Sequence, residues 1–360
     1  MVSCLLMKRQ VRLLVLETAV DDETYGEAYG EVCGEVCGEA YGRMLIHRLA
    51  AELAVQAPAK LNLFFEVLGK RTDGYHEVET LMCPIDLYDT LYFKEEPSGQ
   101  TKLECERVSG VSTSRNPGLN GTGFDGTEPT GNQPVELPQG SDNLVVRAIE
   151  LLRKRTGVTA GVALRLVKRI PLGAGLGGGS SDAAAALIAA NEGWNLDLPR
   201  GQLAEMAAEL GSDVPFFLAD GPAICRGRGE RVEPVAGVGS FSFVVAYPHT
   251  GLSTAEVYAI CRPARQPRGV AAMSDAFSSG DVDQVGRLLF NRLQPAAETL
   301  SPWVKRLHEK FTREDFLGHA MSGSGTSYFG LCRHAHHARR VARRLEANGV
   351  GSVFAVRTCR

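Results

Sequence analysis

The chain has 360 residues, and its 39 Lys and Arg against 42 Asp and Glu give a formal net charge of −3. A protein that mainly binds nucleic acid carries a basic excess, so this class is disfavoured. No run approaches the roughly 18 consecutive apolar residues that cross a bilayer, which disfavours a membrane-spanning protein. Nine cysteines without paired spacing indicate reduced thiols in the cytoplasm, and the length suits two domains.

Residues 1–43 form a low-complexity segment at the start of the chain. Within it, residues 25–42 repeat a four-residue unit with glycine at every fourth position. Glycine raises the entropic cost of ordering a chain, and no apolar face with the period of a helix or a strand offsets that cost. We therefore expect this segment to be disordered, and Met44 is a candidate start of the protein.

The first regular element that the sequence predicts is a strand at residues 54–67. Apolar residues alternate there with other residues, which is the period of a strand with one buried face. Lys60 and Asn62 share the parity of one face. Both side chains can therefore point into the same cavity.

A hairpin follows this strand. Residues 73–74 are Asp-Gly, a turn signal, and they precede Tyr75 and His76 and a second predicted strand at 77–82. Further along, residues 108–140 are rich in Gly, Ser, Thr, Pro and Asn and lack periodicity. That composition predicts a long insertion loop.

The most informative unit of the chain combines a strand, a glycine loop and a helix. A helix is predicted over 144–157 and a strand over 162–168, after which five glycines occur within residues 173–179. An alanine-rich helix then extends to Gly193. Such a loop lets a ligand approach the backbone, and the helix N-terminus offers unpaired N–H groups, so phosphate is the expected ligand.

The loop has three other interpretations. A turn that exists only for packing is disfavoured because it needs one or two glycines rather than five. Gly173, Gly175 and Gly178 match the G-x-G-x-x-G pattern of dinucleotide-binding folds, but Pro171 interrupts the preceding strand. The P-loop pattern is excluded because Gly, not Lys, precedes Ser180.

Four segments in order resemble the motifs of the GHMP kinase superfamily. Residues 171–184 (PLGAGLGGGSSDAA) resemble its second motif, which wraps the phosphates of ATP, and residues 321–331 resemble its third. Residues 58–81 and 211–230 resemble the first motif and the catalytic segment of one branch, the kinases of 4-diphosphocytidyl-2-C-methyl-D-erythritol. The GLGGGSS and DGYH elements favour this branch over the homoserine, mevalonate and galactose kinases.

The resemblance implies an α+β fold of two domains, at about residues 52–222 and 223–360, with the active site in the cleft between them. It implies transfer of the ATP γ-phosphate to the 2-hydroxyl of 4-diphosphocytidyl-2-C-methyl-D-erythritol, in non-mevalonate isoprenoid biosynthesis. The protein would be cytoplasmic and a monomer or homodimer, with small-molecule partners and neither nucleic acid nor membrane. Two alternatives remain: a GHMP kinase acting on another small alcohol, and a nucleotide-binding regulator without turnover.

The same resemblance assigns the ATP site to the glycine loop and the start of the next helix. The residues expected to bind ATP are Pro171, Gly173, Gly175, Leu176, Gly177, Gly178, Gly179, Ser180 and Ser181. Mg²⁺ is expected to bind through the ATP phosphates, with Ser180 or Ser181 as a candidate ligand, and the two serines could equally cap the helix.

Lys60 and Asp213 are the expected catalytic residues. In the resembled family the Asp receives the hydroxyl proton beside the Lys, which holds developing negative charge. Judged from local sequence alone, Asp213 before a proline could instead cap a helix, and Lys60 could be a surface lysine at a strand edge.

The resemblance assigns the remaining candidates to the substrate. Tyr75 would stack on the cytosine and His76 would read its edge, although a partly buried hairpin pair is the alternative. The full set of expected substrate-binding residues is Asn62, Tyr75, His76, Lys168, Ser324 and Gly325.

Two further features bear on the substrate contacts and on nucleic acid. Arg292 and Gln294 stand where the family tends to carry acidic residues. Seven arginines but one acid occur in residues 331–360, and their spacing favours the solvated face of a helix over a nucleic-acid site. We expect His336 and His337 to be solvated there rather than to bind a metal.

Overall fold

The computed structural model describes residues 43–108, 140–236 and 240–359. The expected disorder of residues 1–43 and the expected insertion at 108–140 fall almost entirely outside these ranges. All statements below concern the described residues.

Two long antiparallel strands, β2 (Leu53–Lys70) and β3 (His76–Glu96), form the centre of the first sheet. The predicted strand at 54–67 is therefore confirmed, and the second strand is much longer than the predicted 77–82. The rest of this sheet consists of β1 (Leu45–Arg48), β4 (Thr101–Arg107), β5 (Gly161–Lys168), β6 (Ala223–Gly227), β7 (Arg231–Pro234) and β9 (Phe290–Asn291). β4 pairs with β5, and β9 with β2, in parallel, while the other pairings are antiparallel.

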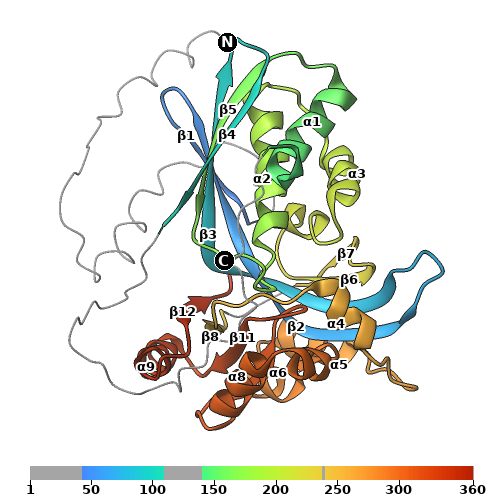
Figure 1. Cartoon of the computed structure of the whole chain (residues 1–360), viewed down its shortest axis with the longest axis vertical. Helices are drawn as coiled ribbons and strands as arrows, with labels where there is room; N and C mark the ends of the chain where they lie inside the picture. Colours follow the sequence, from blue (N-terminus) through green and yellow to red (C-terminus); the bar gives the residue numbers. More distant parts are fainter. Residues whose placement is uncertain (1–42, 109–139, 237–239, 360) are drawn as a thin grey trace, which may run out of the picture. The chain divides into compact units, whose positions relative to one another are not determined.

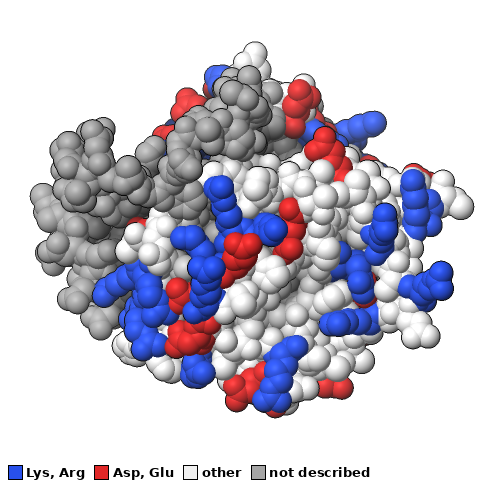
Figure 2. Space-filling view, turned by 60° about the horizontal axis from the view of Figure 1, so that its bottom comes forward, with Lys and Arg blue, Asp and Glu red and all other residues white. Residues whose placement is uncertain are grey.

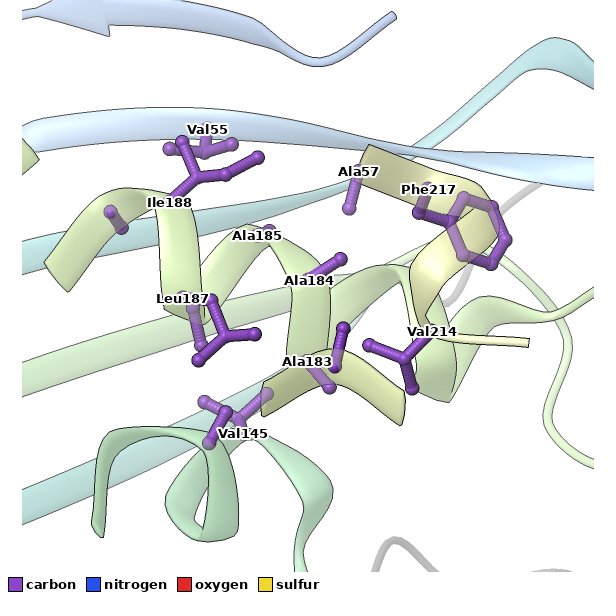
Figure 3. Close-up of a cluster of buried hydrophobic side chains, with 14 of the residues drawn as sticks. Val55, Ala57, Val145, Ala183, Ala184, Ala185, Leu187, Ile188, Val214 and Phe217 are labelled. Atoms are coloured by element: carbon purple, nitrogen blue, oxygen red, sulfur yellow. The ribbon is translucent and has the colours of Figure 1, made fainter. Parts of the chain in front are cut away.

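Helices α1 (Leu144–Thr156), α2 (Gly178–Gly193) and α3 (Arg200–Leu210) cover one face of this sheet (Figure 1). Helix α2 is buried on nearly every side, and six of its 16 residues are alanine, whose small side chains let the strands and the other two helices approach closely. In Figure 3 its alanines lie between Val55 and Ala57 of β2 and Val145 of α1. This packing anchors the helix at whose N-terminus the glycine loop ends.

The second sheet is antiparallel, with the strand order β10-β11-β8-β12. Its strands are β8 (Ser242–Tyr247), β10 (Gly318–Met321), β11 (Tyr328–Cys332) and β12 (Ser352–Arg357). The helices of this part are α4 (Thr254–Ile260), α5 (Ala271–Ser279), α6 (Val282–Leu288), α7 (Gln294–Leu300), α8 (Pro302–Thr312) and α9 (Ala335–Ala347). Among the described helices, none has the length and apolar character needed to span a membrane.

Strands β6 and β7 follow residue 222, where the sequence placed a domain boundary. Both belong to the first sheet, because β6 pairs with β3 and β7 pairs with β6. The first sheet therefore includes residues beyond 222, up to Pro234 in β7 and again in β9. The division of the chain into two domains itself stays a prediction.

Helix α9 carries the arginine-rich face. Val341 and Leu345 are buried while the arginines are exposed, as the sequence predicted. His337 corrects the expectation of a solvated histidine: it is 3% exposed, and its Nε2 lies 3.1 Å from Asp315 Oδ1. Arg340 and Arg344 also pair with Asp315. In Figure 2, basic and acidic side chains are interspersed on the left of the view, whereas basic side chains predominate on the right.

Candidate active site

Two positions of the glycine loop require glycine, both for their backbone conformation and for the lack of space around them. Gly175 and Gly177 adopt φ of 75° and 73°, in the left-handed region. A Cβ on Gly175 would overlap the carbonyl oxygen of Ser322, and one on Gly177 would lie 2.9 Å from Phe217 Cζ. The loop is therefore packed on one side against residues distant in sequence.

Hydrogen bonds join this loop to the first motif, around Lys60, and to the third motif, residues 321–331. The backbone N–H of Lys60 donates to Leu176 O at 2.9 Å, and that of Ser327 donates to Ala174 O at 3.0 Å. The hydroxyl of Ser322 donates to Gly175 O at 3.0 Å. Segments near residues 60, 175 and 322 thus meet at one place.

Helix α2 begins directly after the loop, with Gly177 as its N-cap, so neither Ser180 nor Ser181 caps it. The first N–H groups of a helix have no acceptor within it and give its N-terminus a positive partial charge. The Ser181 hydroxyl is buried and has no hydrogen-bond partner among the described residues. These features suit a phosphate group.

Lys60 lies beside this loop, on the same face of β2 as Asn62, as the sequence predicted. Its side chain is 3% exposed, and its ammonium donates to Asn62 Oδ1 at 2.6 Å and to Gly175 O at 2.9 Å. Asp213 Oδ2 lies 3.8 Å from the same nitrogen. Burial lowers the pKa of Lys60, while the charge of Asp213 acts against that shift. The alternative interpretation of Lys60, as a surface lysine at a strand edge, is therefore wrong.

Asp213 does not cap a helix. The short 3₁₀ helix η2 (Pro215–Leu218) has Val214 at its N-cap position and no side-chain cap. The Asp213 side chain is 36% exposed, so a carboxylate oriented by a buried ammonium remains open to a ligand.

Asn62 is fixed by a chain of buried hydrogen bonds. Its Nδ2 donates to Thr80 Oγ1 at 2.9 Å, and that hydroxyl donates to Phe64 O at 2.7 Å. The Asn62 amide oxygen therefore faces Lys60. Thr80 was missed by the sequence interpretation, because its partner lies on the other strand of the hairpin.

Lys168 occupies a different place from the one the sequence predicted. Its buried ammonium lies between the carboxylates of Asp89 and Asp182, 2.5 Å from Asp182 Oδ2. Asp89 Oδ1 also accepts the backbone N–H groups of Arg169 and Ile170. The expected role in substrate binding is corrected: this cluster ties the chain entering the glycine loop to the first turn of α2, because two buried acids need the cation.

Tyr75 and His76 lie at the hairpin between β2 and β3, in different surroundings. Tyr75 is 53% exposed, and the guanidinium of Arg228 lies 4.9 Å from its ring centroid. His76 stacks on Tyr258 of α4 with a centroid separation of 4.9 Å, and burial lowers its pKa. Tyr258 was missed because nothing local to α4 points to this hairpin.

The third motif, residues 321–331, forms a turn that is fixed by hydrogen bonds from Asn291. Asn291 Nδ2 donates to Met321 O at 2.7 Å and to Gly323 O at 2.8 Å. Ser324 lies at the partly exposed side of this turn, within 2.9 Å of Thr254 Oγ1, whereas Gly325 is buried with φ of 94°. Asn291 is a further residue that the sequence interpretation missed.

The two departures from the family pattern make structural contacts. Arg292 forms a bidentate pair with Glu66, which is 0% exposed, at 2.7 and 2.9 Å. The side chain of Gln294 bonds to Glu298, Tyr328 and the backbone of Met321. Both side chains therefore stabilise the fold through contacts with other residues of the protein.

The described residues contain no cluster of three or more His, Cys, Asp or Glu side chains able to hold a metal ion. A divalent cation would therefore need ligands beyond such side chains. The Ser180 and Ser181 hydroxyls at the loop are the side-chain oxygens nearest in sequence to the glycines.

Comparison with known proteins gives a consistent result. The family model for the GHMP kinases N terminal domain matches residues 143–221, and that for GHMP kinases C terminal matches 273–351. A 4-diphosphocytidyl-2-C-methyl-D-erythritol kinase of Pelotomaculum thermopropionicum is 42% identical over 290 residues, covering 80% of this chain and 92% of the relative. The enzyme of the same name from Bacillus cytotoxicus is 38% identical, covering 81% and 91%.

Solved structures agree. A crystal structure of 4-(cytidine 5'-diphospho)-2C-methyl-D-erythritol kinase has a TM-score of 0.66 at 33% identity, covering 85% of this chain and 99% of that one. A homoserine kinase from Cytophaga hutchinsonii, at 17% identity and a TM-score of 0.62, shares the fold over 87% and 96% of the two chains. The sequence relatives, the two family models and the arrangement of the glycine loop show that this chain belongs to the GHMP kinases, in the family of 4-diphosphocytidyl-2-C-methyl-D-erythritol kinases.

Proposed function

We propose that this protein transfers the γ-phosphate of ATP to the 2-hydroxyl of 4-diphosphocytidyl-2-C-methyl-D-erythritol, a step in non-mevalonate isoprenoid biosynthesis. The observation that carries the proposal is the convergence of Lys60, Asp213 and the glycine loop at one place. Relatives with 38–42% identity over most of the chain are named for this activity. A phosphate cradle beside a carboxylate–ammonium pair is what transfer to an alcohol requires.

Asp213 receives the hydroxyl proton and orients the hydroxyl oxygen. Its carboxylate is partly exposed, and the buried ammonium of Lys60 at 3.8 Å holds it in place. Lys60 in turn is oriented by Asn62 and Gly175 O, so its charge is pre-positioned where negative charge develops on the transferred group. Positioning, rather than strong basicity, accounts for catalysis by such a pair.

The glycine loop and the start of α2 bind the phosphates of ATP. The residues that we assign to this site are Pro171, Gly173, Gly175, Leu176, Gly177, Gly178, Gly179, Ser180 and Ser181. Support comes from the helix N-terminus and from the buried Ser181 hydroxyl without a partner. Mg²⁺, when bound, would neutralise charge on the phosphates, and Ser180 or Ser181 would supply a hydroxyl ligand.

The substrate occupies the other side of the catalytic pair. Tyr75 offers an exposed ring for the cytosine, and His76, held by its stacking on Tyr258, faces the base edge. Asn62, Ser324 and Gly325 complete the assigned substrate side. The site lies between the two proposed domains, residues 52–222 and 223–360.

We also place the protein in the cytoplasm as a monomer or homodimer. The six cysteines of the described ranges are all free thiols, as expected for a reducing compartment. Size-exclusion chromatography with light scattering measures the oligomeric state.

A coupled assay of ADP release tests the activity. Purified protein with ATP and Mg²⁺ is compared with and without 4-diphosphocytidyl-2-C-methyl-D-erythritol, and homoserine and mevalonate serve as alternative alcohols. We expect turnover with the cytidine substrate alone. Turnover with another alcohol would identify the other-kinase alternative, and nucleotide binding without turnover would identify the regulator.

The catalytic assignment is tested in the same assay with Asp213→Asn. The variant keeps the side-chain volume but removes the charge, so kcat falls by about 10²–10⁴-fold while the melting temperature and the Kd of ATP stay near wild type. Asp220→Asn is the matched control, because Asp220 is an exposed carboxylate that pairs with Arg200. Normal turnover of Asp213→Asn contradicts the assignment.

A further inference from the structure

The turn between β6 and β7 places an arginine beside the proposed base site. Arg228 lies on this turn, and its guanidinium lies 4.9 Å from the centroid of the Tyr75 ring. Its backbone N–H donates to Glu230 Oε2 at 2.6 Å, which fixes the turn. The side chain is 30% exposed, so a ligand can reach the charged group. In Figure 1 the β2–β3 hairpin runs past β6 and β7.

The same turn lies against Asp213. A Cβ built on Gly229, the next residue, would lie 3.5 Å from Asp213 Oδ1 and 3.5 Å from Ser212 O. Arg228 therefore belongs to a backbone turn that touches the catalytic carboxylate, while its side chain reaches the proposed base ring. It lies between the two ends of the proposed substrate site.

The guanidinium of Arg228 differs from those of the neighbouring arginines, which form close ion pairs with a carboxylate. Arg71 pairs with Glu77 at 2.6 Å, and Arg231 pairs with the same carboxylate at 2.6 Å. The carboxylate paired with Arg228 is Glu230, with an Nε–Oε2 separation of 3.9 Å, which is too long for a hydrogen bond. A guanidinium has five N–H donors, and among the described residues neither this contact nor the electrostatic attraction of Asp73 occupies one of them in a hydrogen bond.

We propose that Arg228 binds the diphosphate of the substrate. This inference rests on the proposed function, in which a diphosphate joins the cytidine to the reacting alcohol. With the base on Tyr75 and the hydroxyl at Asp213, that diphosphate passes beside the β6–β7 turn. A guanidinium matches phosphate oxygens with paired donors, and the Tyr75 ring on its other side holds it in one orientation.

Calorimetric binding of cytidine and of CDP, without ATP, tests the proposal independently of turnover. The wild type should bind CDP about tenfold or more tightly than cytidine, because only CDP reaches Arg228. In Arg228→Gln this ratio should fall to about twofold, and Arg228→Lys, which keeps the charge but not the paired donors, should lie between. The ratio in the wild type should also decrease with added salt more steeply than in Arg228→Gln.

Two controls separate diphosphate binding from other effects. Arg231→Gln removes the same charge from the same hairpin, where the arginine is already paired with Glu77, and should leave the ratio unchanged. If Arg228 merely holds the Tyr75 ring, cytidine and CDP lose affinity by the same factor and the ratio stays constant, which overturns the proposal. Equal binding of cytidine and CDP by the wild type overturns it as well. An intact, Arg228-dependent ratio in a protein that fails to phosphorylate the cytidine substrate would reject the proposed function alone.

Discussion

Replacing Lys168 with methionine removes the cation of the buried cluster while keeping a side chain of similar length. The ammonium lies between Asp89 and Asp182, and the three side chains are 2%, 0% and 3% exposed. The variant leaves two buried acidic groups that face each other without a cation. Asp89 still accepts two backbone N–H groups, so part of its stabilisation remains.

The cost follows from the burial and from the protonation of the cluster. Breaking a buried ion pair by removing one partner destabilises a protein by about 3–5 kcal/mol. Burial raises the pKa of Asp182, and uptake of a proton by an acid that has lost its cation brings the cost toward the lower limit of that range. We expect a loss of about 3 kcal/mol, which corresponds to a melting temperature lower by about 6–12 °C.

Thermal melting and ATP kinetics measure the effect. The melting temperature should fall and the KM for ATP should rise, because the cluster joins residues 168–170 to the first turn of α2, beside the proposed phosphate site. Lys154→Met, which changes an exposed lysine at the end of α1, is the control and should have no effect. If Lys168→Met melts like wild type and instead raises only the KM for the cytidine substrate, Lys168 binds substrate and the reasoning is refuted.

The pH dependence of the same cluster has a definite sign. A carboxyl whose pKa is raised by folding takes up a proton when the chain folds, so its contribution to stability is present at acid pH and is lost as the pH rises toward 8. In Asp182→Asn this titration is absent. The free energy of unfolding of the wild type should therefore fall relative to this variant between pH 5 and pH 9. A constant difference would show that Asp182 does not titrate in this range.

Three more predictions concern other parts of the site. Gly177→Val places a branched side chain at φ 73° within 2.9 Å of Phe217, so ATP binding should be lost by calorimetry while circular dichroism shows a retained fold; an unchanged Kd would mean that the loop only packs. Tyr75→Ala should weaken binding of the cytidine substrate by about 1–3 kcal/mol without changing the Kd of ATP, and the reverse pattern would misplace the hairpin. Arg292→Ala leaves the buried carboxylate of Glu66 without its cation, so denaturant unfolding should show a loss of about 3–5 kcal/mol; a loss below 1 kcal/mol would show that backbone donors suffice.

The elements of the site that are local in sequence could be predicted without the structure. Alternation at residues 54–67 was enough to predict a strand with Lys60 and Asn62 on one face, because the side chains of a strand alternate whatever it pairs with. The concentration of glycine in residues 173–179 was likewise sufficient to predict a tight loop before a helix, while its binding of phosphate stays a prediction. The resemblance in four ordered motifs identified the family, which the comparisons confirm.

Contacts between distant residues depended on the tertiary structure. The sequence predicted Lys168 as a substrate ligand, but its ammonium is held by Asp89 on β3 and by Asp182 on α2, and nothing near residue 168 specifies those partners. Tyr258 of α4 and Arg228 of the β6–β7 turn contact the β2–β3 hairpin, and the sequence near each of them does not specify this contact either. Periodicity and turn chemistry act between residues a few positions apart, so they determine elements and loops. Which charges become buried together is decided only when those elements pack, because a buried acid must find its partner in space rather than along the chain.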